Sequence, residues 1–277
     1  MMTALLDMFA VARAEFLIGV RNRWAILATA MVLIFASVLS FVGGAPGGAG
    51  HISRLTLSVA SLSALSIYLT PLLALLLSFD SVAGEIDRGA LPILVATPAS
   101  RASIILGKFI GHLAVLAAAI AIGFGAPGLV INAISPGGNF ADLSRLIATS
   151  ILLGAAFLAI GYNVSALART SALAAGLAVG VWLMLVALYD LALLGALVAD
   201  AGGGFSKTVF PWLLVANPAD AFRLYNLSAL DLGGFATGLS GDGRALPFPP
   251  STALLSLAVW IVFALAGAVA AFARLRP

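Results

Sequence analysis

The chain alternates long apolar runs with short polar breaks, and each run is long enough to cross a bilayer. About 20 consecutive apolar residues span the roughly 30 Å hydrocarbon core as an α-helix. Six such runs predict an all-α polytopic membrane protein, a single transmembrane domain over residues 1–277. The predicted spans cover residues 24–43, 56–79, 104–131, 144–167, 171–198 and 252–273.

Polar segments of different character join these spans. A glycine-rich tract, 43–50, follows the first span, and a charged segment, 80–103, which we call the elbow, follows the second. A long glycine- and proline-rich loop, 199–251, precedes the last span. Because proline lacks the N–H that a helix interior needs, we expect Pro71 to kink the second span and Pro127 to bend or break the third.

The segment 1–22 ahead of the first span predicts an interfacial helix. Apolar residues recur at near-helical spacing over 3–21, and charged residues form a polar face, as in helices that lie on a membrane surface. The alternative is an ordinary solvated terminus. A cleavable signal ending near Ala45 is disfavoured, because signal peptides have shorter apolar runs of about 7–15 residues. The charged residues assigned to this segment are Arg13, Glu15, Arg21 and Arg23.

Positive charge predicts the orientation, since short loops rich in Lys and Arg stay on the cytoplasmic side. With both termini inside, nine basic residues lie on the inner side and five on the outer side. Three of those five belong to the long 199–251 loop and carry little weight. We therefore predict cytoplasmic termini. The inner residues are Arg13, Arg21, Arg23, Arg88, Arg101, Lys108, Arg169, Arg274 and Arg276, and the outer ones are Arg54, Arg145, Lys207, Arg223 and Arg244.

Composition supports a lipid-facing protein. Of the 277 residues 62% are hydrophobic and 9% charged, and the mean hydropathy is +1.15. Soluble domains hold roughly 45–50% apolar and about 25% charged residues. The chain has no cysteine, which excludes disulfides, thiolate catalysis and cysteine metal sites. Its net charge of +3 comes without a basic cluster suited to nucleic acid.

The sequence lacks motifs for catalysis or metal binding. Gly107-Lys108 matches the end of a phosphate-binding loop, but Phe109 replaces the required Ser or Thr. No nucleophile-elbow or zincin motif occurs. We therefore expect no cofactor or metal in this chain, and ATP and Mg²⁺ on a separate ATPase subunit. Cu(I) prefers sulfur and imidazole ligands, and the spans offer no close pair among Met31, Met184 and His112.

The elbow concentrates charge in a chain that otherwise avoids it. Two amphipathic turns, broken by prolines, would lie at the membrane surface with their charges toward the cytosol. This arrangement indicates a docking surface for a soluble partner, and a plain solvated loop is the alternative. The residues assigned to the surface are Glu85, Asp87, Arg88, Gly89, Leu91, Thr97, Pro98 and Arg101.

The elbow also carries a family motif. It runs from an acidic residue through Arg88-Gly89, Thr97-Pro98 and Ser100-Arg101 to Gly107-Lys108-Phe109. In this order it resembles the permease subunits of type-two ABC transporters. The resemblance implies that the elbow packs on an ATPase subunit, and that residues 1–22 form the interface helix of that family.

Further runs, spread over nearly the whole chain, resemble one branch of that family, the permeases of the transporter that matures the copper sites of nitrous oxide reductase. The runs are 21–24, 77–85, 106–112, 176–182, 189–191, 211–214, 217–220 and 223–227. The resemblance implies a homodimer in the bacterial inner membrane, two cytoplasmic ATPase subunits and a periplasmic copper-associated repeat protein. It further implies a role in assembling the copper–sulfur centre, by mechanical transmission or by moving a sulfur species. The outer segment would meet the periplasmic partner through Pro211, Trp212, Asn217, Asp220 and Arg223.

Two features of the spans have two interpretations each. Asp190 lies roughly 28 Å along the fifth span, near the outer interface, at a rise of about 1.5 Å per residue. It either has a hydrogen-bonded structural role or couples to the outer loop. The Gly107/Gly111 and Gly176/Gly180 pairs allow close helix approach, either within the chain or at a homodimer seam.

Three other functions are alternatives to this interpretation. An ABC permease that exports a drug, lipid or glycoconjugate would share the elbow. A secondary transporter needs paired intramembrane charges or inverted repeats. An intramembrane protease needs a catalytic pair. The sequence offers neither the features of a secondary transporter nor a catalytic pair.

Overall fold

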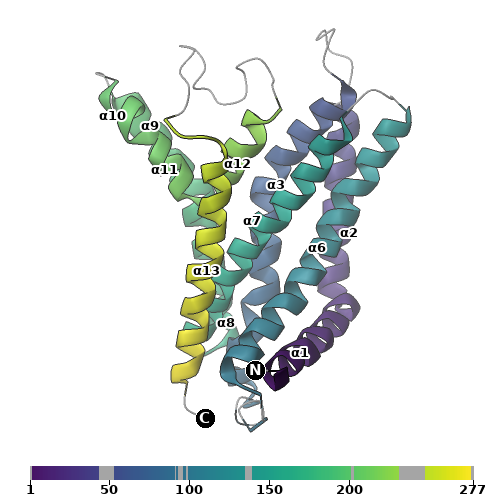
Figure 1. The fold of residues 1–277 in the computed structure, drawn as a ribbon, viewed down its shortest axis with the longest axis vertical. Coiled ribbons are helices and arrows are strands. Elements are labelled where there is room, and N and C mark those ends of the chain that lie inside the picture. The colour runs from purple at the N-terminus through teal and green to yellow at the C-terminus, as the bar shows by residue number, and fades with distance from the viewer. Residues whose placement is uncertain are drawn as a thin grey trace.

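The computed structural model is an elongated bundle of helices that run side by side (Figure 1). It describes residues 2–43, 53–90, 92, 96–97, 99–134, 139–200, 203–230 and 247–275. All regular elements among these residues are helical, which confirms the predicted all-α fold. They are α1 (Met2–Arg21), α2 (Arg23–Gly43), α3 (Arg54–Ser78), α4 (Asp80–Asp87), α6 (Arg101–Ile134), α7 (Phe140–Leu167), α8 (Ser171–Trp182), the π-helical turn η1 (Leu183–Leu188), α9 (Tyr189–Ala199), α10 (Gly204–Thr208), α11 (Phe210–Ala216), α12 (Pro218–Ser228) and α13 (Ser251–Arg274).

Five helical runs of the described chain are long and apolar enough to cross a membrane. A sixth candidate is the pair α1 and α2, which pass the same test together and are bent by 65°. Within that pair, α2 covers the predicted first span. The other five runs are Arg54–Asp87, Arg101–Ile134, Phe140–Leu167, Ser171–Ala199 and Ser251–Arg274, and each contains one predicted span.

The two ends of the bundle carry different elements (Figure 1). At the lower end in that view lie α1, α4 and the last turn of α13, and we call this the elbow end. At the upper end lie α10, α11 and α12, which we call the opposite end. The first helix and the end of the last helix of the chain therefore lie at the same end of the bundle.

The helix of the second span extends into the predicted elbow. One residue, Phe79, separates α3 from α4, so the elbow begins as a further two turns of helix. Gly89 ends this helix with a φ of +68°, a conformation that costs glycine little. Of the two outcomes expected at Pro127, a bend or a break, the break does not occur, because α6 continues past it to Ile134.

The predicted 199–251 loop is helical between 204 and 228. Asn217 caps α12 by accepting a hydrogen bond from the Ala219 N–H at 2.8 Å, and Pro218 occupies the first helical position. Both are start signals for a helix. The helix then packs on α3, α7 and α13, with Phe222 fully buried. Glycine and proline content was misleading here, because the local capping signal and burial of an apolar face favour a helix.

α7 and the fifth span differ most in burial. In α7 61% of the most apolar window is buried, and it contacts α3, α6 and α13, so it forms the centre of the bundle. In the fifth span, α8 to α9, only 17% of that window is buried. A Cβ built at Gly176 or Gly180 meets nothing within 4 Å, so this glycine pair has no packing role within the chain.

The other glycine pair holds α1 against α6. A Cβ at Gly107 would lie 2.7 Å from the Met8 carbonyl oxygen, and a Cβ at Gly111 would lie 2.7 Å from the Ala12 carbonyl oxygen. Only glycine permits such an approach of two backbones. The first of the two interpretations, packing within the chain, is therefore the one the structure supports for Gly107 and Gly111.

We expect Gly111→Ala to destabilise the protein by about 1–3 kcal/mol, because the added methyl group overpacks a rigid backbone contact. Gly180→Ala is the matched control, since its methyl group enters open space. The measurement is the thermal unfolding of both purified variants in detergent. Equal unfolding temperatures for Gly111→Ala and the parent would contradict the close α1–α6 contact.

Candidate coupling site

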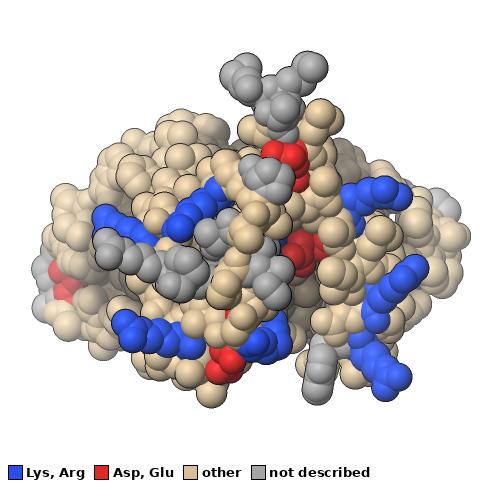
Figure 2. Space-filling model, turned by 90° about the horizontal axis from the view of Figure 1, so that it is seen from below, with Lys and Arg blue, Asp and Glu red and all other residues tan. Residues whose placement is uncertain are grey.

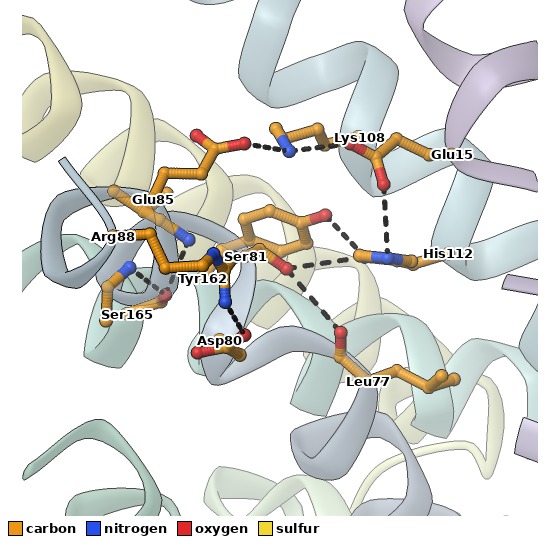
Figure 3. Close-up of polar contacts among 12 residues, drawn as sticks. Glu15, Leu77, Asp80, Ser81, Glu85, Arg88, Lys108, His112, Tyr162 and Ser165 are labelled. Carbon is orange, nitrogen blue, oxygen red and sulfur yellow. Dashed lines mark hydrogen bonds and ion pairs between the residues drawn. The ribbon is translucent and has the colours of Figure 1, made fainter. Parts of the chain in front are cut away.

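A buried lysine joins three elements at the elbow end (Figure 3). The Lys108 Nζ on α6 lies 2.6 Å from the Glu15 Oε1 of α1 and 2.7 Å from the Glu85 Oε1 of α4. Side-chain exposure is 7% for the lysine and 16% for each glutamate. Charge-assisted hydrogen bonds of this length are strong. Removing one partner of a buried ion pair strongly destabilises the fold, because the other charge is left uncompensated. The pairing therefore fixes the interfacial helix and the elbow relative to one spanning helix.

A histidine one turn further along α6 extends the network to α7. The His112 Nδ1 lies 2.7 Å from the hydroxyl of the fully buried Tyr162 and 3.4 Å from that of Ser81. Its Nε2 lies 3.6 Å from the Glu15 carboxylate. Figure 3 shows these side chains converging between α1, α4, α6 and α7. Four elements thus share one polar cluster, which we call the Lys108 cluster (Glu15, Ser81, Glu85, Lys108, His112, Tyr162).

The other face of α4 is fastened to the turn between α7 and α8. The Ser165 hydroxyl of α7 accepts hydrogen bonds from two successive N–H groups of α4, at 2.9 and 3.0 Å. The Ser171 hydroxyl donates to Asp80 at 2.6 Å, and the Ser171 N–H donates to Asp87 at 3.2 Å. A carboxylate at a helix N-terminus is favourable, so these acids hold the first turn of α8 against the elbow.

Arg101 binds the end of the last span. Its guanidinium donates to the carbonyl oxygens of Phe272, Ala273 and Leu275 at 3.2, 2.8 and 2.7 Å. A basic side chain on the last carbonyls of a helix satisfies acceptors that have no partner within the helix. This residue, assigned from the sequence to the docking surface, therefore ties α6 to α13 inside the subunit.

The elbow residues assigned to docking fall into two groups. Asp87, Arg88, Gly89 and Thr97 are exposed, and the Arg88 side chain, 62% exposed, makes a 3.1 Å ion pair with Asp80. Glu85 instead points inward to the Lys108 cluster. The remaining assigned residues, Leu91 and Pro98, lie outside the described residues.

A cleft of about 690 Å³ opens beside the cluster, between α1, α2, α3, α4 and α6. Its polar lining includes Glu15, Asp80, Glu85, Lys108 and His112, and many of the other lining residues are apolar. Figure 2 views the molecule from the elbow end, with Lys and Arg side chains spread over this face and an acidic side chain recessed near its middle. Arg13, Arg21 and Arg23 are all exposed.

A second charged cluster lies toward the opposite end and includes Asp190. The Arg223 guanidinium of α12 binds both carboxylate oxygens of Asp190, at 2.6 and 3.1 Å. It also donates to Asp220 on its own helix at 2.9 Å. Burial raises the pKa of Asp220 to about 8, and the negative charge of Asp190 adds to the shift, while Arg223 opposes it. Asp190 is therefore hydrogen-bonded, and its partner belongs to the outer segment.

Two hydrogen bonds join the fifth span to α11 and α12 beside this pair. The Asn217 side chain donates to the Leu185 carbonyl oxygen within η1 at 2.7 Å, and the Tyr189 hydroxyl donates to the Leu213 carbonyl oxygen at 2.8 Å. A π-helical turn displaces carbonyl groups from the regular ladder. The amide of Asn217 satisfies one of the carbonyl groups in this turn.

The five outer residues predicted to meet a partner differ in exposure. Trp212 is 56% exposed and packs against Phe248 with ring centroids 5.0 Å apart. Pro211, Asn217 and Asp220 are buried in this subunit. Arg223 is partly exposed. Trp212 is the one of the five that presents a large apolar surface.

Sequence reasoning missed the roles of Lys108 and His112. From the sequence, Lys108 belongs to an incomplete phosphate-binding motif. His112 is considered only as a candidate Cu(I) ligand, without a second ligand close to it. Their spacing of four residues on an apolar helix was the available signal, because residues at i and i+4 share one helix face. Polar pairs of this kind within a membrane helix face the protein interior.

Comparison with known proteins settles the family. A family model described as "ABC-2 family transporter protein" matches residues 9–275. The chain belongs to the ABC-2 transporter family. It is 39% identical over 268 residues to a "Probable ABC transporter permease protein NosY" from Stutzerimonas stutzeri, which covers 95% of this chain and 97% of that protein. It is 40% identical over 271 residues to the protein of the same description from Pseudomonas aeruginosa, with 96% and 98% covered.

The chain is thus the transmembrane permease subunit of an ABC transporter. In this ABC-2 permease the Lys108 cluster and the Asp190–Arg223 pair lie toward opposite ends of one bundle. Within the described residues no group of three or more His, Asp or Glu side chains is placed to hold a metal ion.

We expect Lys108→Met to destabilise the permease by about 3–5 kcal/mol, because it leaves two buried carboxylates without their cation. Adding Glu15→Gln and Glu85→Gln should recover part of this loss by removing the unpaired charges. The exposed Arg88–Asp80 pair provides the control, since Arg88→Met should cost only about 0–1 kcal/mol. Unfolding in detergent measures all three, and a mild effect of Lys108→Met would contradict the pairing.

A pH dependence follows from Asp220. Its raised pKa means that the folded protein favours the protonated acid. The resulting stabilisation is complete below the pKa of an unfolded aspartate, about 3.9, and is lost as the pH rises through about 8. We expect the unfolding temperature to fall between about pH 4 and about pH 8 and to level off above that range, and Asp220→Asn to flatten this fall. An unchanged slope in Asp220→Asn would assign the pH dependence to other groups.

Proposed function

We propose that this permease couples ATP hydrolysis by a separate cytoplasmic ATPase subunit to a periplasmic partner, and so supports assembly of the copper–sulfur site of nitrous oxide reductase. The observation that carries the proposal is the fastening of α4 to α6, α7 and α8 at once, with α1 joined to α4 through the shared Lys108. A force applied to the elbow reaches all of these helices, because each contact involves a buried or helix-capping group.

The elbow end faces the cytoplasm in this proposal, in agreement with the predicted charge distribution. The ATPase then docks on the exposed elbow residues Asp87, Arg88, Gly89 and Thr97, together with Leu91 and Pro98 of the same segment. Glu85 acts from within, through its ion pair with Lys108. ATP and Mg²⁺ belong to the ATPase, and α1 lies along the inner surface of the bacterial inner membrane.

The opposite end faces the periplasm and offers α10, α11 and the exposed Trp212 to a copper-associated repeat protein. Aromatic anchors of this kind are common at the centres of interfaces. Identity of about 40% to two proteins described as NosY, over nearly their full length, supports the copper-site assignment. Two copies of the permease form a homodimer in this assembly.

Mechanical transmission is favoured over transport of a sulfur species. The contacts at the two ends are ion pairs and caps that join helices to each other, which suits the transfer of motion. The cleft at the elbow end lies beside these contacts.

We expect Arg88→Glu to reduce co-purification of the ATPase subunit by at least about tenfold, because a like-charge contact at an interface costs several kcal/mol and about 1.4 kcal/mol already corresponds to tenfold. Arg21→Glu is the matched control, because Arg21 is also an exposed arginine of the elbow end and lies outside the elbow. Recovery of the ATPase with Arg88→Glu at the level of the parent would count against docking on the elbow.

The same variants test the biological role. In a strain that lacks this permease, the parent should restore copper to nitrous oxide reductase, Arg88→Glu should fail, and Arg21→Glu should succeed. A reductase that keeps its copper–sulfur centre without the permease would favour the alternative, an exporter of a drug, lipid or glycoconjugate.

A further inference from the structure

The cleft of about 690 Å³ at the elbow end changes from polar to apolar along its length. One wall is α6, which lines the cleft from Lys108 to Ala119, roughly 16 Å at a rise of about 1.5 Å per residue. This length is about half of the roughly 30 Å hydrocarbon core, or one leaflet of a bilayer. Lys108 and His112 lie nearer the elbow end of the wall, and Val115, Leu116 and Ala119 continue it as an apolar surface.

Apolar side chains of three other helices line the same cleft. Ile18 comes from α1, Ala28 from α2, and Leu73 and Leu76 from α3. Because α3 and α6 belong to membrane-spanning runs, this apolar part lies at the depth of the lipid chains. The volume is within the range of about 300–1,000 Å³ that is typical of ligand sites. The cleft therefore suits an amphiphile with a polar headgroup at the elbow end and a chain beyond it.

The polar part of the cleft holds one more acid than base. Glu15, Asp80 and Glu85 line it with Arg88 and Lys108, and its histidine is counted as neutral. Arg88 pairs with Asp80 at the exposed rim, so the surplus acid lies at Lys108, whose single ammonium serves both glutamates (Figure 3). The Oε2 atom of Glu85 accepts no hydrogen bond from any of the described residues. A buried carboxylate without full compensation is costly, so this part of the cleft favours a further cationic donor.

We infer that the cleft binds one phosphatidylethanolamine from the leaflet at the elbow end. Its ammonium compensates the surplus acid beside Glu15 and Glu85, and an acyl chain follows the apolar wall of α6. A primary ammonium has three N–H donors, whereas a choline headgroup has none and a glycerol headgroup brings no positive charge. The inference goes beyond the proposed function and does not depend on it, because it concerns the charge balance of the Lys108 cluster in the folded subunit.

A second copy of the chain suits this cleft less well than a lipid does. In a two-fold homodimer the same surface of each copy meets at the seam. A seam along the cleft would therefore place its surplus acid opposite an identical surplus, and like charges at an interface are disfavoured. A lipid with a cationic headgroup balances the charge instead.

Lipid competition on the purified full-length permease tests the inference. Delipidated protein in detergent is mixed with equal amounts of dioleoyl phosphatidylethanolamine, phosphatidylglycerol and phosphatidylcholine, and native mass spectrometry measures the lipid retained. We expect phosphatidylethanolamine to be retained at least about tenfold more than either other lipid, the change expected from one hydrogen bond to a charged group. It should also raise the unfolding temperature, because a ligand of the folded state stabilises that state. Glycerophosphoethanolamine, which lacks the chains, should not compete at the same concentration.

Two variants test the two parts of the cleft. Ala28→Phe fills the apolar part from α2 without altering a charge, and it should abolish both the retention of phosphatidylethanolamine and the rise in unfolding temperature. Ala30→Phe is the matched control, because Ala30 is exposed on the same helix and does not line the cleft. Glu15→Gln removes the surplus charge and leaves Lys108 paired with Glu85. It should still retain lipid, but without the preference for phosphatidylethanolamine.

Four results would overturn the inference. One is equal retention of the three lipids by the parent, and another is full retention of phosphatidylethanolamine by Ala28→Phe. A dimer that retains no lipid would show that the second copy covers the cleft. Competition by glycerophosphoethanolamine as strong as that of the whole lipid would identify a soluble amine as the ligand. These results leave docking of the ATPase on the elbow untouched, so failure of the lipid site is distinguishable from failure of the proposed function.

Discussion

The elbow end of the molecule depends on one buried cation. Lys108 lies between Glu15 and Glu85 at 2.6 and 2.7 Å, with little solvent to replace either partner. Placing three charges in such a site is costly unless each is paired, so the arrangement leaves α1, α4 and α6 few alternative positions. The glycine contacts of α6 with α1 and the hydrogen bond of His112 to Tyr162 build on this arrangement.

Because α4 is held on both faces, it does not move independently of the helices bound to it, and its displacement is passed on to them. One face pairs Glu85 with the Lys108 cluster, and the other binds Ser165 and Ser171. The exposed part, from Asp87 to Gly89, follows directly along the chain. A docked ATPase would therefore act on a segment whose movement involves four helices, which is the physical basis of the coupling role that we propose for this ABC-2 permease.

At the opposite end, too, a basic side chain binds two acidic side chains, but the packing of the helices that it joins differs. The basic side chain is Arg223, and the acidic side chains belong to the short helix α12 and to a span with few core contacts. At the elbow end the ion pairs join packed helices, whereas at the opposite end the pair joins the packed helix α12 to a span that has little of its surface buried in this subunit. This difference in packing, more than the charges themselves, gives the two ends separate roles.

The sequence by itself determined the spans, the elbow and the family. Bilayer thickness sets the length of an apolar run, so a span can be recognised from consecutive residues. The family motif of the elbow is a fixed order of residues close together in the chain, so it too can be recognised from the sequence. Only the tertiary structure decided the partners of Lys108, Asp190 and Arg101, and the helical form of 204–228. Arg101 and Phe272, for example, lie 171 residues apart in the chain. Which charges meet across such separations depends on how the helices pack, and no local pattern carries that information.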